Sequence, residues 1–370
     1  MSVCAAPAVP ATGTPPVETD ALVIGAGPVG LYQVFQLGLL GVKAHVVDAL
    51  PHAGGQCTEL YPDKPLYDIP ALPVCTGREL TDRLLQQIAP LGATLHYGQQ
   101  VSTLEKQADG RFLVGSGNGT YFLATTVFIA AGVGAFLPRT LKLPGLEALA
   151  SPQLTYRITQ TSDYAGKNLV IVGGDDAALE AALQLCAAYP DGTPHKAKSI
   201  TLVHRRDVLQ ASPATEAAVR ALCQAQHMRF MVGQITGHED QQGQLTGVRV
   251  TGVDGAEQLV EANAVLVMLG LSPKLGPVTQ WGLDLDRKQL QVSTETFSTS
   301  APGIFAVGDV NTYPGKKKLI VCGFHECVLA AFGAMPFIFP DRRVQLEYTT
   351  SSARLHHILG VTALPHGEAI

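Results

Sequence analysis

Short, mostly apolar runs recur along the chain, and most of them end in glycine or another small residue. They span residues 21–24, 44–47, 125–131, 168–172, 199–203, 263–269 and 304–307. Apolar runs of this length are typical of strands buried on both faces in a parallel sheet. Two of them, 21–24 and 168–172, lead through a glycine turn into an apolar stretch that predicts a helix. The pattern therefore predicts two α/β units built from strand, turn, helix and strand.

The first glycine turn carries a nucleotide-binding fingerprint. It reads Gly25-Ala-Gly27-Pro-Val-Gly30, and the strand after it ends in Asp48. Gly25 permits the tight turn, Gly27 lets the backbone approach a pyrophosphate, and Gly30 lets the helix pack closely on the strand. Asp48 is placed to bond the hydroxyls of a ribose. A glycine-rich surface turn is the alternative, but strand, turn, helix and terminal acid in register favour a dinucleotide site.

The second turn carries a related fingerprint with a different charge at the end of its second strand. The turn begins with Gly173 and Gly174, and the strand that follows the helix ends next to Arg205 and Arg206. Planar guanidinium groups at that place suit the 2′-phosphate of NADP, whereas an NAD site would have an acid there. The sequence therefore favours NADPH over NADH. An exposed charge pair is the alternative interpretation of the two arginines.

An acid interrupts the second fingerprint. Asp175 stands where its second glycine belongs. A carboxylate at a helix N-terminus suits the helix dipole but repels a phosphate. We therefore expect this half to bind its nucleotide less conventionally, or more weakly, than the first half.

The order of the segments predicts an inserted domain. Residues 1–18 are rich in Ala, Pro and Thr and are typical of a disordered tail. A late strand ends in Gly308-Asp309 and needs a sheet to join, and the sheet of the first fingerprint is the simplest. We therefore predict an α/β fold with two Rossmann-like dinucleotide-binding domains. The second domain, 137–290, is inserted between the two parts of the first, 19–136 and 291–370.

Composition argues against several classes of protein. The chain has 370 residues, 46% of them hydrophobic, and a formal net charge of -5. This mild charge argues against a general affinity for nucleic acid. No apolar run is long enough for a membrane span, and the first residues lack the features of a signal peptide, so we expect no membrane partner. The seven cysteines include no CxxC pair, which argues against a disulfide framework or a metal site and favours the cytoplasm.

Taken together, the two fingerprints and Gly308-Asp309 resemble those of flavoproteins with two dinucleotide-binding domains, of which thioredoxin reductase is one. Residues 54–68, 315–326 and 348–352 narrow the resemblance to the thioredoxin-reductase-type (type 2) ferredoxin–NADP+ reductases of bacteria. This resemblance implies an FAD domain interrupted by an NADPH domain, and a homodimer. It also implies that electrons pass between NADPH and a ferredoxin or flavodoxin through FAD.

The same resemblance implies which residues contact FAD. Beside the glycines of the first fingerprint they are Asp48, Gln56, Tyr61, Val101, Phe136, Asp309 and Thr350. Asp48 would bond the adenosine ribose, Val101 would lie at the adenine, and Asp309 at the ribityl and pyrophosphate part. Tyr61 and Tyr348 would each cover one face of the flavin, although ordinary packing is the alternative for both. They would position the flavin, and no catalytic acid or base is expected; Tyr348 would have to move if it covers the nicotinamide side.

Two basic runs lie close in sequence to these implied flavin contacts. Lys316–Lys318 follow Asp309, and Arg342–Arg343 precede Tyr348. Ferredoxins and flavodoxins are acidic, so a docking surface for them should be basic. A solvated charged face is the alternative interpretation of both runs.

Two other functions stay open. A thioredoxin-reductase-like disulfide reductase needs a redox pair of cysteines, but residues 154–167 contain none, and Pro62 stands where a partner of Cys57 would be. Cys322 and Cys327 match neither known redox pair, so buried packing is their expected role. A flavin-binding sensor or scaffold without turnover is the second alternative. Weak NADPH binding at the acid of the second fingerprint would favour it.

Overall fold

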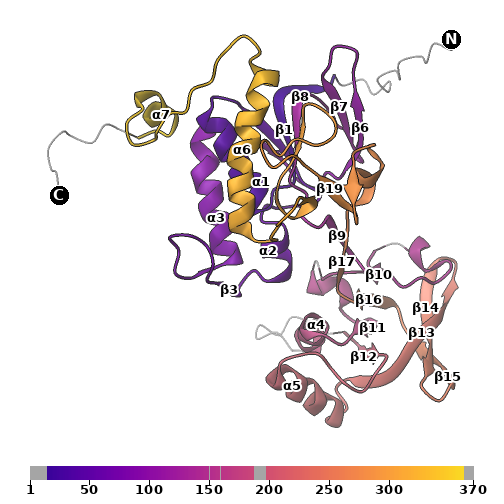
Figure 1. Cartoon of the computed structure of the whole chain (residues 1–370). Helices are drawn as coiled ribbons and strands as arrows, with labels where there is room; N and C mark the ends of the chain where they lie inside the picture. The colour runs from indigo at the N-terminus through magenta and orange to yellow at the C-terminus, as the bar shows by residue number, and fades with distance from the viewer. Residues whose placement is uncertain (1–14, 150, 159, 187–196, 362–370) are drawn as a thin grey trace, which may run out of the picture. The chain divides into compact units, whose positions relative to one another are not determined.

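The computed structural model describes residues 15–149, 151–158, 160–186 and 197–361. The chain forms two units, one of which comprises Met1–Phe136 together with Pro273–Ile370 (Figure 1). The other unit is Leu137–Ser272. The second unit is therefore inserted into the first, as the order of the strands predicts.

The inserted unit ends earlier than the sequence predicts. The first unit resumes at Pro273, whereas the expected end of the inserted domain was residue 290. Val278, Leu283 and Leu290 are buried in a core that belongs to the first unit. That core also contains Ile24 and Phe122. Apolar contacts thus assign the segment 273–290 to the first unit, although its sequence carries no motif of its own.

The first unit is built on a sheet with the strand order β5-β2-β1-β8-β7-β6, and β20 also pairs with β8. The first half of β8 pairs with β7 antiparallel, and its second half pairs with β20 parallel. The strands are β1 (Val17–Ile24), β2 (Ala44–Val47), β5 (Thr94–His96), β6 (Val101–Lys106), β7 (Phe112–Ser116), β8 (Tyr121–Ile129) and β20 (Ile304–Ala306). Because β1, β2, β8 and β20 are parallel, their carboxyl ends lie at the same edge of the sheet.

Helices α1, α3 and α6 lie together beside this sheet (Figure 1). The helices of the unit are α1 (Pro28–Leu39), α2 (Gln56–Leu60), α3 (Gly77–Ile88), α6 (Ile320–Ile338) and α7 (Ala353–Ile358). Pro28 starts α1, where its missing N–H costs no hydrogen bond. A capping box between Thr76 and Glu79 starts α3.

Several short elements belong to the first unit or lie where the chain passes from one unit to the other. They are η1 (Ala89–Leu91), η4 (Gly276–Gln280), η5 (Gly308–Val310), β3 (Pro65–Leu66), β4 (Cys75–Thr76), β18 (Leu285–Asp286), β19 (Gln289–Gln291), β21 (Asn311–Thr312), β9 (Ala135–Pro138) and β17 (Leu271–Lys274). Of these, η5 follows directly on β20 and therefore lies at the carboxyl edge of the sheet.

The second unit has a sheet with the strand order β10-β16-β11-β12-β13-β14-β15. Strands β10, β16, β11, β12 and β13 pair in parallel, and β13, β14 and β15 form an antiparallel meander. Its elements are β10 (Leu154–Thr155), β11 (Asn168–Gly173), β12 (Ser199–His204), β13 (Arg229–Gln241), β14 (Gln244–Gly252), β15 (Glu257–Glu261), β16 (Ala264–Met268), α4 (Asp176–Cys186), α5 (Pro213–Gln224), η2 (Leu146–Ala148) and η3 (Thr161–Tyr164). The expected Rossmann-like order of strand, helix and strand is present from β11 to β12.

Helix α6 is the one described helix that is long and apolar enough, by length and composition, to cross a membrane. Core helices of other proteins pass the same test. Here Cys327, Ala330 and Ala334 of α6 are buried in one core that also contains residues of α1 and α3. Its Glu326 is fully buried and hydrogen-bonded. These contacts are those of a helix that packs inside the first unit.

The stacked rings of Phe128 and Phe305 join β8 to β20. We therefore expect a large loss of stability when one of the rings is removed. The two rings are buried, with centroids 5.1 Å apart. We expect Phe128→Ala to destabilise the first unit by about 3–5 kcal/mol, because it removes a buried ring and leaves a cavity. Urea unfolding followed by circular dichroism measures the shift. Leu259→Ala, at a side chain that is 54% exposed, is the control and should unfold like the parent.

Candidate functional site

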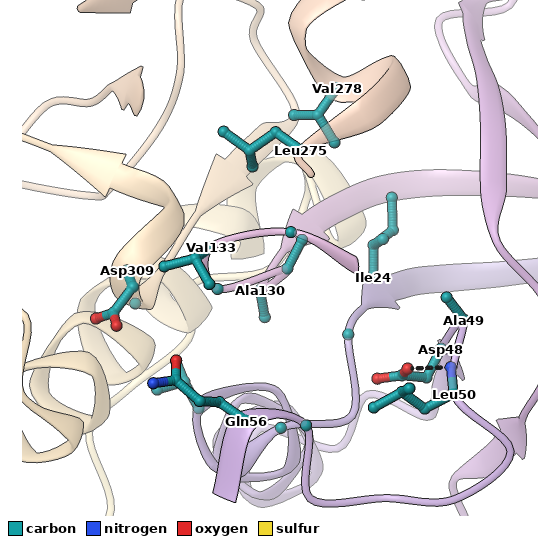
Figure 2. A pocket seen from close by; sticks show the side chains of 18 of the residues that line it. Ile24, Asp48, Ala49, Leu50, Gln56, Ala130, Val133, Leu275, Val278 and Asp309 are labelled. Carbon is teal, nitrogen blue, oxygen red and sulfur yellow. Dashed lines mark hydrogen bonds between the residues drawn. The ribbon is translucent and has the colours of Figure 1, made fainter. Parts of the chain in front are cut away.

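A cavity opens at the carboxyl edge of the first unit's sheet (Figure 2). Seven of the predicted site residues line it: Gly25, Gly27, Asp48, Gln56, Tyr61, Val101 and Asp309. Figure 2 shows Asp48 at one side of the cavity and Asp309 with Gln56 at the other. Ala130, just past the end of one strand, lies between them, and Ile24, at the end of the neighbouring strand, lies on the side of Asp48. The cavity therefore spans several strand ends.

The first glycine turn forms one wall of this cavity, and its glycines are required by close contacts. Gly25 has a φ of +111°, and a Cβ atom there would lie 2.5 Å from the carbonyl oxygen of Ala130. A Cβ atom on Gly30 would lie 1.9 Å from the carbonyl oxygen of Gly25. Gly27 lines the cavity just before α1, and a Cβ atom there would lie 3.9 Å from the Cα atom of Gly55. Backbone can therefore approach a ligand closely at this helix N-terminus.

Asp48 fixes the other side of the glycine turn. Its carboxylate accepts hydrogen bonds from the backbone N–H of Ala26 at 2.5 Å and of Leu50 at 2.7 Å. Burial raises the pKa of Asp48, and the two N–H donors oppose that rise. The carboxylate thus ties the end of β2 to the turn after β1, while the residue still lines the cavity.

At the opposite side, Asp309 lies in η5 and is half-buried. Burial raises the pKa of its carboxyl, whereas the ammonium groups of Lys316 and Lys318 lower it. Tyr61 and Cys57 line the same region, and the Cys57 thiol donates a 3.7 Å hydrogen bond to the Tyr61 hydroxyl. Burial raises the pKa of both groups. The thiol is therefore held in its neutral form, which is a poor nucleophile.

Three predicted residues are not placed at the cavity. Tyr348 is 68% exposed, Thr350 is also exposed, and neither lines the cavity. Phe136 belongs to β9, but its side chain lies outside the described part of the structure. The cavity in this single chain is therefore built without the segment that precedes α7.

Sequence reasoning missed a further wall of the cavity. Leu275, Pro277, Val278 and Trp281 line it from the segment around η4. The apolar pattern assigns this segment to the inserted domain and therefore predicts no part of the first site there. No motif in its local sequence indicates a part in the cavity. Only the knowledge that the inserted unit ends before Pro273 would have indicated it.

The second unit brings its predicted residues together at the carboxyl ends of β11 and β12. A Cβ atom on Gly174 would lie 2.5 Å from Nδ1 of His204, so the turn and the end of β12 are in close contact. Arg205 and Arg206 follow His204, are exposed, and form no ion pair with any described residue. Asp207 next to them pairs with Arg220 at 2.8 Å. The two arginines are therefore free to bind an anion.

Asp175 has a structural role that the sequence pattern suggested only in part. Its carboxylate accepts a 3.1 Å hydrogen bond from the backbone N–H of Ala178 in the first turn of α4. It thus caps the helix and occupies an N–H group that a phosphate would otherwise use. The backbone at this turn is bridged to Gln210, because the Gln210 N–H donates to the Gly174 carbonyl at 2.6 Å.

Two turns of this kind at the ends of parallel strands define a protein with two nucleotide-binding domains. The profile of the pyridine nucleotide-disulphide oxidoreductase family matches residues 19–326. Ferredoxin–NADP reductase from Albidiferax ferrireducens is 63% identical over 94% of this chain and 97% of its own length. The enzyme of the same name from Methylibium petroleiphilum is 58% identical over 96% of this chain and 97% of its own length.

Solved structures share the fold at lower sequence identity. Thioredoxin reductase from Lactococcus lactis is 22% identical, with a TM-score of 0.56 over 87% of this chain and 99% of that chain. A bacillithiol disulfide reductase from Staphylococcus aureus is 15% identical, with a TM-score of 0.58 over 86% of this chain and 98% of that chain. At this identity the likeness concerns the fold alone.

These findings define an oxidoreductase of the two-domain flavoprotein class, which uses FAD and a pyridine nucleotide. Within the pyridine nucleotide-disulphide oxidoreductases, the chain belongs to the ferredoxin–NADP reductases. The resemblance drawn from residues 54–68, 315–326 and 348–352 is thereby confirmed, and so are the cofactors FAD and NADPH.

The described residues contain neither a disulfide nor a cluster of metal ligands. Six cysteines there are free thiols, and no group of three or more His, Cys, Asp or Glu residues could hold a metal ion. Cys327 is fully buried in α6, which agrees with its expected packing role.

The role of the two hydrogen bonds that Asp48 accepts can be tested by FAD binding. We expect Asp48→Ala to weaken FAD binding by about tenfold or more, because the turn after β1 loses a charged acceptor that orders it. Titration of the apoprotein with FAD, followed by flavin fluorescence, measures the dissociation constant. Asp109→Ala removes an exposed acid in a distant turn and is the matched control. Equal affinities of the two variants would contradict the role given to Asp48.

Proposed function

We propose that the chain transfers electrons between NADPH and a ferredoxin through FAD held in the cavity of the first unit. The observation that carries this proposal is the cavity itself, which runs from Asp48 to Asp309 across several strand ends. Parallel sheets bind dinucleotides at such carboxyl edges. When FAD is bound, its flavin supplies the conversion between a hydride, which carries two electrons, and single electrons.

The residues at one side of the cavity fit the adenosine and pyrophosphate part of FAD. Gly25, Gly27 and Gly30 keep side chains away from the N-terminus of α1, where a pyrophosphate meets free N–H groups. Asp48 and Val101 line the cavity on this side, where Asp48 would bond the ribose and Val101 would lie against the adenine. In this proposal the chain binds the cofactor by its backbone and orients it by a half-buried acid.

The residues at the other side fit the flavin part. Gln56 and Asp309 offer polar groups to the ring and to the ribityl chain, and Tyr61 offers an aromatic face. No group here is needed as a catalytic acid or base. The task of these residues is to position the ring and to exclude water, while the neutral Cys57 thiol stays out of the reaction.

Phe136, Tyr348 and Thr350 remain proposed flavin contacts. Because Tyr348 and Thr350 are exposed and outside the cavity, they reach a flavin only if their segment moves or if it serves a second copy of the chain. We favour the second copy, which makes these contacts part of the proposed homodimer. An exposed tyrosine and Leu346, 64% exposed in the same segment, are consistent with an apolar contact surface.

NADPH is assigned to the second unit. Gly173 and Gly174 form its turn, and Arg205 with Arg206 would bind the 2′-phosphate. Because Asp175 caps α4, the pyrophosphate would find fewer free N–H groups here than at the first turn. Binding would therefore rest more on the two arginines than on the helix N-terminus.

The disulfide-reductase alternative finds no support in the thiols. Cys57 has a pKa raised by burial, and position 62 holds a proline. The alternative of a flavin sensor without turnover depended on Asp175 alone. The hydrogen bond that it accepts from the Ala178 N–H gives that acid a structural role as the cap of α4.

The partner would dock near the flavin side of the cavity. Lys318 lines the cavity and Lys317 beside it is exposed, so both are available to an acidic ferredoxin or flavodoxin. Arg342 and Arg343 are exposed as well. We propose the cytoplasm as the location, because free thiols are typical of a reducing compartment.

The pyridine-nucleotide assignment is tested by rapid mixing of the FAD-loaded protein with NADPH or NADH. We expect flavin reduction to be much faster with NADPH, and the reduced protein to pass electrons to ferredoxin. Replacing both Arg205 and Arg206 by Ala should raise the NADPH concentration for half-maximal rate by at least tenfold, with little change for NADH. Arg229→Ala, at the first residue of β13 and so at the opposite edge of that sheet, is the control. A protein that NADPH does not reduce at all would overturn the proposal.

Docking is tested by charge reversal. We expect Lys317→Glu to slow ferredoxin reduction about tenfold at low ionic strength, because the partner is acidic, and the difference from the parent should shrink with added salt. Lys43→Glu makes the same charge change at an exposed site just before β2, at the end of that strand remote from the cavity, and serves as the control. Identical salt dependence of both variants would count against docking at this lysine.

A further inference from the structure

One fully buried carboxylate organises the loop that carries Asp309. Glu326 of α6 has no exposed surface, yet no part of the proposed function uses it. Its Oε2 atom accepts from the Gly308 N–H at 2.7 Å and from Nδ2 of Asn311 at 2.8 Å. Its Oε1 atom accepts from the Tyr313 hydroxyl at 3.0 Å and from Nζ of Lys316.

Lys316 is directed inward and not toward solvent. Its side chain is 7% exposed, and its ammonium group pairs with Glu326 and donates to the Gly308 carbonyl at 2.9 Å. The ammonium also lies 5.3 Å from the centre of the Tyr313 ring. It is thereby withdrawn from the docking surface to which the lysine run was assigned, while Lys317 and Lys318 remain exposed. A buried ion pair gives little net stability, so its presence calls for another role.

The pair holds Gly308 by both of its backbone groups. Glu326 accepts from the N–H and Lys316 donates to the carbonyl, so the peptide groups on either side of Gly308 are fixed. Gly308 itself has a φ of +79°, and a Cβ atom there would lie 3.2 Å from Val29 in the first turn of α1. The residue after Gly308 is Asp309, which lines the cavity.

We propose that Lys316 and Glu326 are positioning residues for FAD, which clamp Gly308 so that the Asp309 carboxylate is held in the cavity. Neither residue lines the cavity; they act through Asp309. This inference rests on the proposed function, namely on FAD binding in the first unit.

The test compares FAD affinity and the near-ultraviolet spectrum of bound flavin in Lys316→Met, Glu326→Gln and the double variant. Trp281 is the chain's single tryptophan and lines the cavity, so quenching of its fluorescence reports FAD binding independently of turnover. We expect about tenfold or greater weakening in each single variant. The double variant should lose less than the product of the two single effects, because the residues act as a unit. Lys43→Met, at an exposed lysine just before β2 that does not line the cavity, should bind FAD like the parent.

A role through Asp309 has a signature that general loss of stability lacks. In the Asp309→Asn background, Lys316→Met should change FAD affinity by less than about threefold, because the group it positions is already altered. An undiminished effect in that background would overturn the inference, as would single variants that are less stable but bind FAD normally. If Lys316→Met does not fold, Lys316→Arg replaces it; the wider guanidinium should still weaken binding, and parent-like affinity would be contrary. A parent protein that binds no FAD would refute the proposed function instead.

Discussion

Strands β1, β2, β8 and β20 all end at one edge of one sheet, and the site depends on this constraint. Parallel pairing brings four chain segments together there: the glycine turn at 25–30, Asp48, residues 130–134 and the Gly308-Asp309 turn. The first and last of these segments lie far apart in the sequence. Backbone groups beyond the strand ends are left without sheet partners, so they are free to meet a ligand or to be fixed by side chains.

The polar groups buried near this edge serve mainly to fix those backbone groups. Asp48 accepts from the N–H of Ala26 in the first turn and from the N–H of Leu50 after β2, and Glu326 accepts from the N–H of Gly308. Glu326 is fully buried and Asp48 is half-buried, and burial of a charge is unfavourable unless hydrogen bonds satisfy it. The loops of the site are therefore held by specific hydrogen bonds, in contrast to the apolar packing that holds the strands beneath them.

Charged residues that look alike in the sequence take different roles in the fold. Lys316 is buried beside a carboxylate, whereas Lys317 is exposed. In the second unit, Asp207 pairs with Arg220, while Arg205 and Arg206 have no ion-pair partner among the residues that the structure describes. Their availability for a phosphate or a protein partner follows from these contacts.

The sequence by itself determined the two glycine turns and the inserted topology, because glycine spacing and apolar runs depend on local backbone geometry. Residues 54–68, 315–326 and 348–352 carried the resemblance to the family. The sequence also pointed to Asp48, which directly follows a strand, whereas Asp309 was expected at the site from the family resemblance. Only the tertiary structure decided that the segment of η4 and Trp281 lines the first cavity, and that Lys316 turns inward. Those outcomes depend on contacts between residues distant in sequence, for which a linear pattern of polar and apolar positions carries no signal.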